Sequence, residues 1–174
     1  MEEQFRQRTR LWRRRSSRCE LAQQRDPDFY ANLPRMELFQ VDDAGCLFIS
    51  PAINDWELLN EHGVDTVIDL DDDIDDGVPT VPNQCLYIYF PIFDEDLPDL
   101  DKLQAIGDLG ARVVSAGHHV LSHCGMGFNR SALMAGVILH KLGMPGPIVV
   151  QRLRERRPGA LFNECFAAYL ESLT

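Results

Sequence analysis

The sequence predicts an α/β fold in which a central, mostly parallel sheet is flanked by helices on both faces. Three observations indicate this fold. Short apolar runs typical of buried strands alternate with segments of helical spacing. One of these segments, residues 132–142, is apolar on nearly every side, which is typical of a helix buried in the middle of a fold. The length of 174 residues and the hydrophobic content of 45% suit one domain with a single core.

The strands are expected at four apolar runs, and the last of them leads into a glycine-containing loop that begins at residue 124. Helices are expected where apolar residues recur at spacings of three and four, as Leu100, Leu103 and Ile106 do. Gly143 and Pro145 end the buried helix, since both residues commonly follow a helix. The expected strands are 46–49, 66–68, 85–90 and 119–121, and the expected helices are 99–116, 132–142, 147–156 and 163–173.

The charge is distributed unevenly along the chain. Residues 1–18 carry seven arginines against Glu2 and Glu3, a balance of +5, whereas the formal net charge of the whole chain is −10. We therefore expect residues 1–29 to be an appended arginine-rich arm and residues 30–174 to form the folded domain. The remainder of the chain repels nucleic acid and anionic membranes at long range, and no nucleic acid is expected as a partner. An acidic partner for the arm is left open, as is docking of the arm on an anionic lipid.

Other features limit the class of protein. No apolar run is long enough to span a membrane. The first residues lack the apolar core of a signal peptide, so we expect a cytoplasmic protein. The five cysteines are an odd number without CxxC pairs, which favours reduced thiols over disulfides or a zinc site. The acidic stretch 69–76 is expected to be a solvated loop, with binding of a cation or of the arm as the alternatives.

Residues 123–131 have the pattern of an anion-binding loop between a strand and a helix. Such a loop directs backbone N–H groups and the positive end of the helix dipole at one point. Gly125 and Gly127 are expected to allow positive φ angles and close backbone approach. Cys124 is then placed where the thiolate is favoured, and the fork of Arg130 can hold two oxygens of one phosphate. The complete loop is His123, Cys124, Gly125, Met126, Gly127, Phe128, Asn129, Arg130 and Ser131.

The bare spacing of Cys and Arg carries little weight, because Cys19 and Arg25 also show it in the polar arm. Requiring the preceding His, the Gly three residues after the Cys and the Ser after the Arg reduces the expected chance matches to the order of one in ten thousand. Only Cys124 satisfies all of these requirements.

The pattern His-Cys-x-x-Gly-x-x-Arg-Ser resembles the active loop of the cysteine-dependent protein tyrosine phosphatases, and among them the small (atypical) dual-specificity type. Looser similarities at 47–51, 63–70 and 157–163 follow in the expected order, so the resemblance covers about residues 30–173. It implies hydrolysis of phosphate monoesters through a phosphocysteine intermediate on Cys124, without a metal or an organic cofactor.

The resemblance also implies a general acid on a loop some thirty residues before the cysteine. Asp94 is the first choice because it follows the strand most directly, and Asp96 and Glu95 are the second and third. Ser131 is implied to stabilise the departing thiolate, although it is as well suited to cap the helix. His123 is implied to help hold the loop and its charge.

The loop has no charged residue between Cys124 and Arg130, which argues against substrates with several phosphates. We expect a phosphorylated protein or peptide, most simply one that carries phosphotyrosine, with or without phosphoserine and phosphothreonine. Met126 and Phe128 would contact an aryl leaving group. Three alternatives stay open: a phosphate-binding module without turnover, a lipid or carbohydrate phosphatase, and a sulfur-transfer or arsenate-reducing enzyme with Cys46, Cys85 or Cys165 as resolving thiol.

Overall fold

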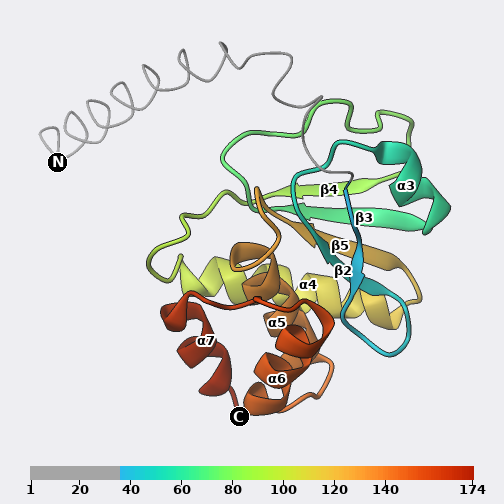
Figure 1. Cartoon of the computed structure of the whole chain (residues 1–174). Coiled ribbons are helices and arrows are strands. Elements are labelled where there is room, and N and C mark those ends of the chain that lie inside the picture. Colours follow the sequence, from blue (N-terminus) through green and yellow to red (C-terminus); the bar gives the residue numbers. More distant parts are fainter. Residues whose placement is uncertain (1–35) are drawn as a thin grey trace, which may run out of the picture. The chain divides into compact units, whose positions relative to one another are not determined.

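The computed structural model describes residues 36–174, so the expected arm at 1–29 lies outside the described residues. Its centre is a sheet of five strands in the order β1-β2-β5-β3-β4 (Figure 1). Neighbours among β2, β5, β3 and β4 are parallel, whereas β1 runs antiparallel to β2, so the sheet is mixed but mostly parallel. The strands are β1 (Phe39–Gln40), β2 (Leu47–Ser50), β3 (Val64–Asp69), β4 (Leu86–Tyr89) and β5 (His119–His123).

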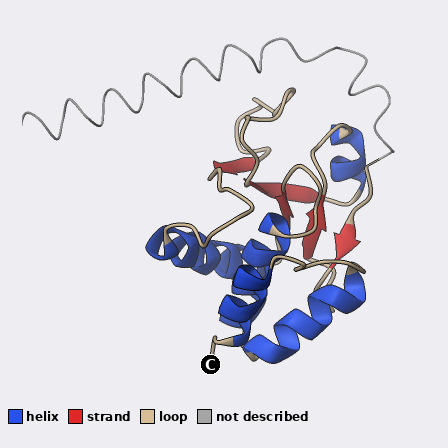
Figure 2. Ribbon diagram, turned by 60° about the vertical axis from the view of Figure 1, so that its left-hand side comes forward, coloured by secondary structure: helices blue, strands red, loops and turns tan. Residues whose placement is uncertain are grey.

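Helices cover both faces of the sheet, as the alternation of side chains along the strands requires. Phe48, Val67 and Leu121 point to one face and form a small core with Leu59. Their neighbours in the strands point to the opposite face and join the main core. Figure 2 shows helices on either side of the sheet. The helices are α3 (Trp56–Glu61) on the small core, and α4 (Leu100–Ser115), α5 (Arg130–Lys141), α6 (Gly146–Arg156) and α7 (Glu164–Glu171) on the main core.

The α/β class, the mostly parallel sheet and the central helix are confirmed. In α5 all nine residues from Ser131 to Leu139 are buried. The expected strands and helices all exist, with ends displaced by at most two residues. The sequence analysis missed β1, because a strand of two residues is too short to show a period.

Two glycines let α4 pack closely on α5. A Cβ atom at Gly107 would lie 2.4 Å from Cγ1 of Val137, and one at Gly110 would lie 2.6 Å from Cδ1 of Ile138. Any larger residue at these positions would force the two helices apart. This close contact holds α5, and with it the loop at its start, against the rest of the main core.

None of the helices formed by residues 36–174 combines the length and the apolar character needed to cross a bilayer.

Candidate active site

The loop 124–129 lies at the carboxyl end of β5, in the middle of the sheet, where open α/β sheets commonly bind ligands. Cys124 begins the loop and is only 2% exposed. The backbone N–H of Gly127 donates to Cys124 Sγ at 3.3 Å, and Ser131 Oγ lies 3.6 Å from the same sulfur. The sulfur is thus held between the loop backbone and the first turn of α5.

The two loop glycines are required for different reasons. Gly127 has a φ of +69°, and a Cβ there would lie 2.6 Å from the backbone of Ser50 and Pro51. Gly125 does not have a positive φ, so that part of the expectation is wrong. At Gly125 space is the constraint, because a Cβ would lie 3.3 Å from Asp71 Oδ2 and 3.4 Å from Nη2 of Arg130.

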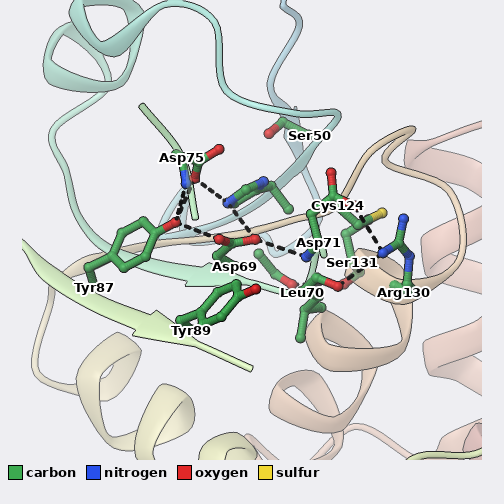
Figure 3. A network of polar contacts seen from close by, with 12 residues as sticks. Ser50, Asp69, Leu70, Asp71, Asp75, Tyr87, Tyr89, Cys124, Arg130 and Ser131 are labelled. Carbon is green, nitrogen blue, oxygen red and sulfur yellow. Dashed lines mark hydrogen bonds and ion pairs between the residues drawn. The ribbon is translucent and has the colours of Figure 1, made fainter. Parts of the chain in front are cut away.

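The hydrogen bonds of Arg130 within the described residues all come from Nη1, so the other nitrogens of its guanidinium are left for a ligand (Figure 3). Its Nη1 donates to the carbonyl of Leu70 and to Asp71 Oδ1, both at 3.1 Å, and to the carbonyl of Ile92 at 3.4 Å. Its Nε is buried and has no hydrogen-bond partner. A buried N–H without an acceptor costs about 1–3 kcal/mol, and an oxygen of a bound anion would remove that cost.

Asp94 is joined to the loop by a pair of asparagines. Asn129 Nδ2 donates to Asp94 Oδ2 at 2.9 Å, and Asn163 Nδ2 donates to Asp94 Oδ1 at 3.1 Å. Asn163 also donates its backbone N–H to Asn129 Oδ1 and its side-chain amide to the carbonyl of Glu95. Of the three acids considered from the sequence, Asp94 is therefore the one whose carboxylate contacts a loop residue.

His123, the last residue of β5, belongs to a buried polar network with Asp69, Asp75 and Tyr87, the last three of which are labelled in Figure 3. Its Nε2 lies 2.9 Å from Asp75 Oδ2 and 3.5 Å from Asp69 Oδ1. Both contacts are close enough for an ion pair, but their geometry is not that of a hydrogen bond. Neither ring nitrogen of His123 therefore has a hydrogen-bond partner. The Tyr87 hydroxyl lies 2.5 Å from Asp69 Oδ2 and 2.9 Å from Asp75 Oδ2, and it accepts from the Asp75 backbone N–H.

Burial shifts the acidity of this network. It raises the pKa of Asp69 above its ordinary value, against the opposing effects of the Tyr87 hydrogen bond and of His123. The pKa of Tyr87 is also raised, first by burial and then by its hydrogen bond to Asp69. The expectation of a solvated acidic loop is therefore wrong for Asp69, which is fully buried, and for Asp75, whose side chain is 9% exposed.

Asp69, Asp75 and His123 are also the only group among residues 36–174 with the composition and spacing of metal ligands. One ligand atom from each lies within 4.8 Å of the others. Two carboxylates and an imidazole suit a divalent transition metal. In this structure the three side chains contact one another and Tyr87 instead, and we assign them the role of holding the loop.

The apolar residues of the loop differ in their surroundings. The guanidinium of Arg157 stacks on the ring of Phe128 at 4.1 Å, and the ring of Phe162 lies 6.3 Å away. Phe128 thus packs against its own chain, while Met126 is 67% exposed. Of the two residues expected to contact an aryl group, Met126 is the one left open to solvent.

The sequence analysis missed Asp71, Asn163 and Tyr87. Asp71 follows the end of β3 by two residues, and this position at the carboxyl edge of a parallel sheet was a usable signal. Tyr87 and Asn163 have no such signal, because each reaches the site from a distant part of the chain. Three cysteines were considered as resolving thiols. In residues 36–174, Cys46 and Cys85 are half-buried and Cys165 is exposed, and no contact joins any of them to Cys124.

Comparison with known proteins finds structural but not sequence relatives. No family model matches the chain, and no curated protein matches it significantly. Among 152 matching chains of solved structures is a mouse dual-specificity phosphatase complexed with zinc tungstate, with 26% identity and a TM-score of 0.66. The match covers 80% of this chain and 87% of that one.

Two human proteins are similar as well. A single-residue variant of human DUSP28 matches with 25% identity and a TM-score of 0.65, over 77% of this chain and 93% of that one. A tyrosine phosphatase-like serine/threonine/tyrosine-interacting protein shares the fold with 20% identity and a TM-score of 0.63, over 77% of this chain and 93% of that one.

Fold and loop together define a class: the chain has the fold of the cysteine-dependent protein tyrosine phosphatases and carries a loop with their His-Cys-x-x-Gly-x-x-Arg-Ser pattern. Among these proteins it has the structure of the small (atypical) dual-specificity type.

Proposed function

We propose that this protein hydrolyses phosphate monoesters through a phosphocysteine intermediate, with protein phosphotyrosine as the simplest substrate. The proposal depends above all on one observation. One loop carries both the sulfur of Cys124, toward which the N–H of Gly127 is turned, and Arg130, whose Nε is buried and has no hydrogen-bond partner. A thiolate nucleophile and an unsatisfied donor at one anion-binding loop are what displacement at phosphorus requires.

The reaction has two steps. In the first, the thiolate of Cys124 attacks phosphorus, the ester P–O bond breaks, and Asp94 gives its proton to the leaving oxygen. Arg130 and the loop N–H groups stabilise the negative charge on the remaining oxygens. In the second, water attacks the phosphocysteine, Asp94 takes its proton, and the thiolate leaves with Ser131 beside it. The contacts of these residues support the roles, and no step needs a metal.

The assignment of Asp94 is supported by its contacts with Asn129 and Asn163. These hold the carboxylate on the loop side, while Glu95 contributes only its carbonyl to the same group of hydrogen bonds. A singly phosphorylated substrate is supported by the loop itself, in which Arg130 is the one charged side chain after His123.

A phosphate-binding module without turnover is the second candidate. One protein of the same fold is described as a tyrosine phosphatase-like interacting protein, which is why this candidate is kept. In the present chain Cys124, Arg130 and an acid in contact with the loop are all in place, which favours turnover.

The test is hydrolysis of a small aryl phosphate in the presence of EDTA. We expect the native protein to be active, Cys124→Ser to be inactive, and Asp94→Asn to lose about 10²–10⁴-fold in kcat, because general acid catalysis contributes that much. Asp96→Asn is the matched control and is expected to keep most of its activity. A loss in Asp96→Asn but not in Asp94→Asn would move the acid to Asp96.

If the native protein binds phosphate or tungstate but releases no product, the phosphate-binding module replaces the enzyme. Activity that EDTA abolishes would contradict the thiolate mechanism.

A further inference from the structure

A second cavity adjoins the phosphate-binding loop. It measures about 290 Å³, just below the roughly 300–1,000 Å³ of sites for drug-sized ligands, so its size suits a single side chain. Its walls are apolar, and carboxylates stand among them. The residues that matter here are Ile92, Phe93, Leu97, Glu95, Asp96 and Asp99.

The cavity is connected to the loop through two residues. Ile92 lines the cavity and its carbonyl accepts from Nη1 of Arg130 at 3.4 Å. Asp94, in the same segment, accepts from Asn129 of the loop. Through these two contacts, the segment that lines the cavity touches Asn129 and Arg130 of the loop.

The charge of the surroundings is strongly negative. Residues 36–101 contain 18 carboxylate side chains and no lysine or arginine. Three described cations contact the surroundings of the site: Arg130 itself, Arg157 on the ring of Phe128, and Lys102, which lies 3.3 Å from Asp99. Lys102 offsets Asp99, so Glu95 and Asp96 are the cavity carboxylates without an ion-pair partner among residues 36–174.

We propose that this cavity receives a lysine or arginine side chain next to the phosphorylated residue, so that the site selects phosphopeptides with basic flanking residues. The apolar walls suit the methylene stem of such a side chain, and Glu95 and Asp96 suit its charged end. Opposite charges across an interface also steer the encounter. This inference deepens the proposed function and rests on it, because it concerns the substrate of the same loop.

The experiment compares three phosphotyrosine peptides of equal length, flanked by arginine, by alanine or by glutamate. The kcat/KM of each is measured by phosphate release at low and at physiological salt, with a small aryl phosphate as the reference. We expect the arginine peptide to exceed the alanine peptide about tenfold at physiological salt, since two partly exposed ion pairs contribute together about that factor. The glutamate peptide is expected to be the poorest substrate.

Two double variants locate the preference. Glu95→Gln with Asp96→Asn is expected to reduce the tenfold preference to about twofold. Glu155→Gln with Glu171→Gln removes the same charge from another cavity of about 410 Å³, between α6 and α7, and is expected to leave the preference unchanged. Because each preference is a ratio within one variant, a general loss of folding does not imitate the result.

Equal rates for the arginine and glutamate peptides would overturn the inference while leaving the phosphatase intact, as the aryl phosphate shows. A preference that survives in the Glu95/Asp96 variant would also overturn it, since bulk charge would then suffice. If the native protein hydrolyses neither peptides nor aryl phosphate, the proposed function fails. Binding of the same three peptides, followed by fluorescence anisotropy, would then decide the charge preference separately.

Discussion

At the scale of single residues, the site pairs the carboxylate of Asp71 with Arg130, the arginine proposed to bind phosphate. Asp71 Oδ1 lies 3.1 Å from Nη1 of Arg130, and both side chains are largely buried. The ion pair orients the guanidinium but also offsets the charge that a phosphate needs. The two carbonyls on the same nitrogen give orientation without that electrostatic disadvantage.

We therefore expect Asp71→Asn to bind inorganic phosphate about fivefold more tightly. The asparagine oxygen can still accept from Nη1, while the negative charge beside the anion is removed. The measurement is the inhibition constant of phosphate as a competitive inhibitor of aryl phosphate hydrolysis. Weaker inhibition in the variant would mean that the main role of Asp71 is to hold Arg130 in place.

The residues of the reaction were more predictable than the residues that support them. Cys124, Gly127 and Arg130 lie within one short motif whose chemistry depends on local spacing, and the structure brings them together. Asp69 and Asp75 were expected in solvent because they belong to an acidic run. Their burial depends on Tyr87 of another strand and on His123, and no local pattern reports such a contact.

At the scale of helices and strands, the site depends on how closely α4 approaches α5. The buried face of α5 continues directly from the loop, so any displacement of this helix moves Arg130 and Ser131 at its start. Gly107 of α4 lies against Val137 of α5 with no room for a Cβ atom.

Gly107→Ala is accordingly expected to destabilise the protein, although alanine favours a helix by about 1 kcal/mol over glycine. Overpacking commonly costs about 1–3 kcal/mol, so we expect a net loss of about 1–2 kcal/mol in the free energy of unfolding, measured in urea. Val137→Ala should restore part of it, making the double variant more stable than the sum of the two single effects. A Gly107→Ala protein as stable as the native one would contradict this packing.

The order of strands and helices was largely predictable, and their ends were less so. The helices at 99–116 and 132–142 were predicted from their sequence patterns, because in a long amphipathic or apolar segment many residues support the same assignment. In contrast, β1 has two residues and is defined only by its pairing with β2. Its existence depends on a tertiary contact, which a single segment of sequence does not contain.

At the scale of the whole molecule, charge is the dominant property. The formal net charge is −10, and residues 36–101, which supply Asp71 and Asp94 to the site, contain no lysine or arginine. Like charges at this density repel one another and destabilise the compact state.

Stability is therefore expected to rise with ionic strength. Between 20 and 300 mM sodium chloride the melting temperature should increase by about 2–4 °C, which corresponds to about 1 kcal/mol for a chain of this size. Differential scanning fluorimetry measures it, with uncharged sucrose as the control for general effects of solutes. A melting temperature that falls with salt would show that attractive ion pairs, such as those of Arg152 and Arg156 with Asp43, outweigh the repulsion.

The place of β5 has a consequence for how the molecule is made. This strand lies between β2 and β3, although it follows β3, β4 and α4 in the chain. During synthesis the pair β1-β2 and the pair β3-β4 can join into one sheet only after residues 119–123 have been made. Because contacts so distant in sequence slow folding, the domain is expected to be completed late. Cys124 follows that strand directly, so its loop is assembled only once the sheet has closed.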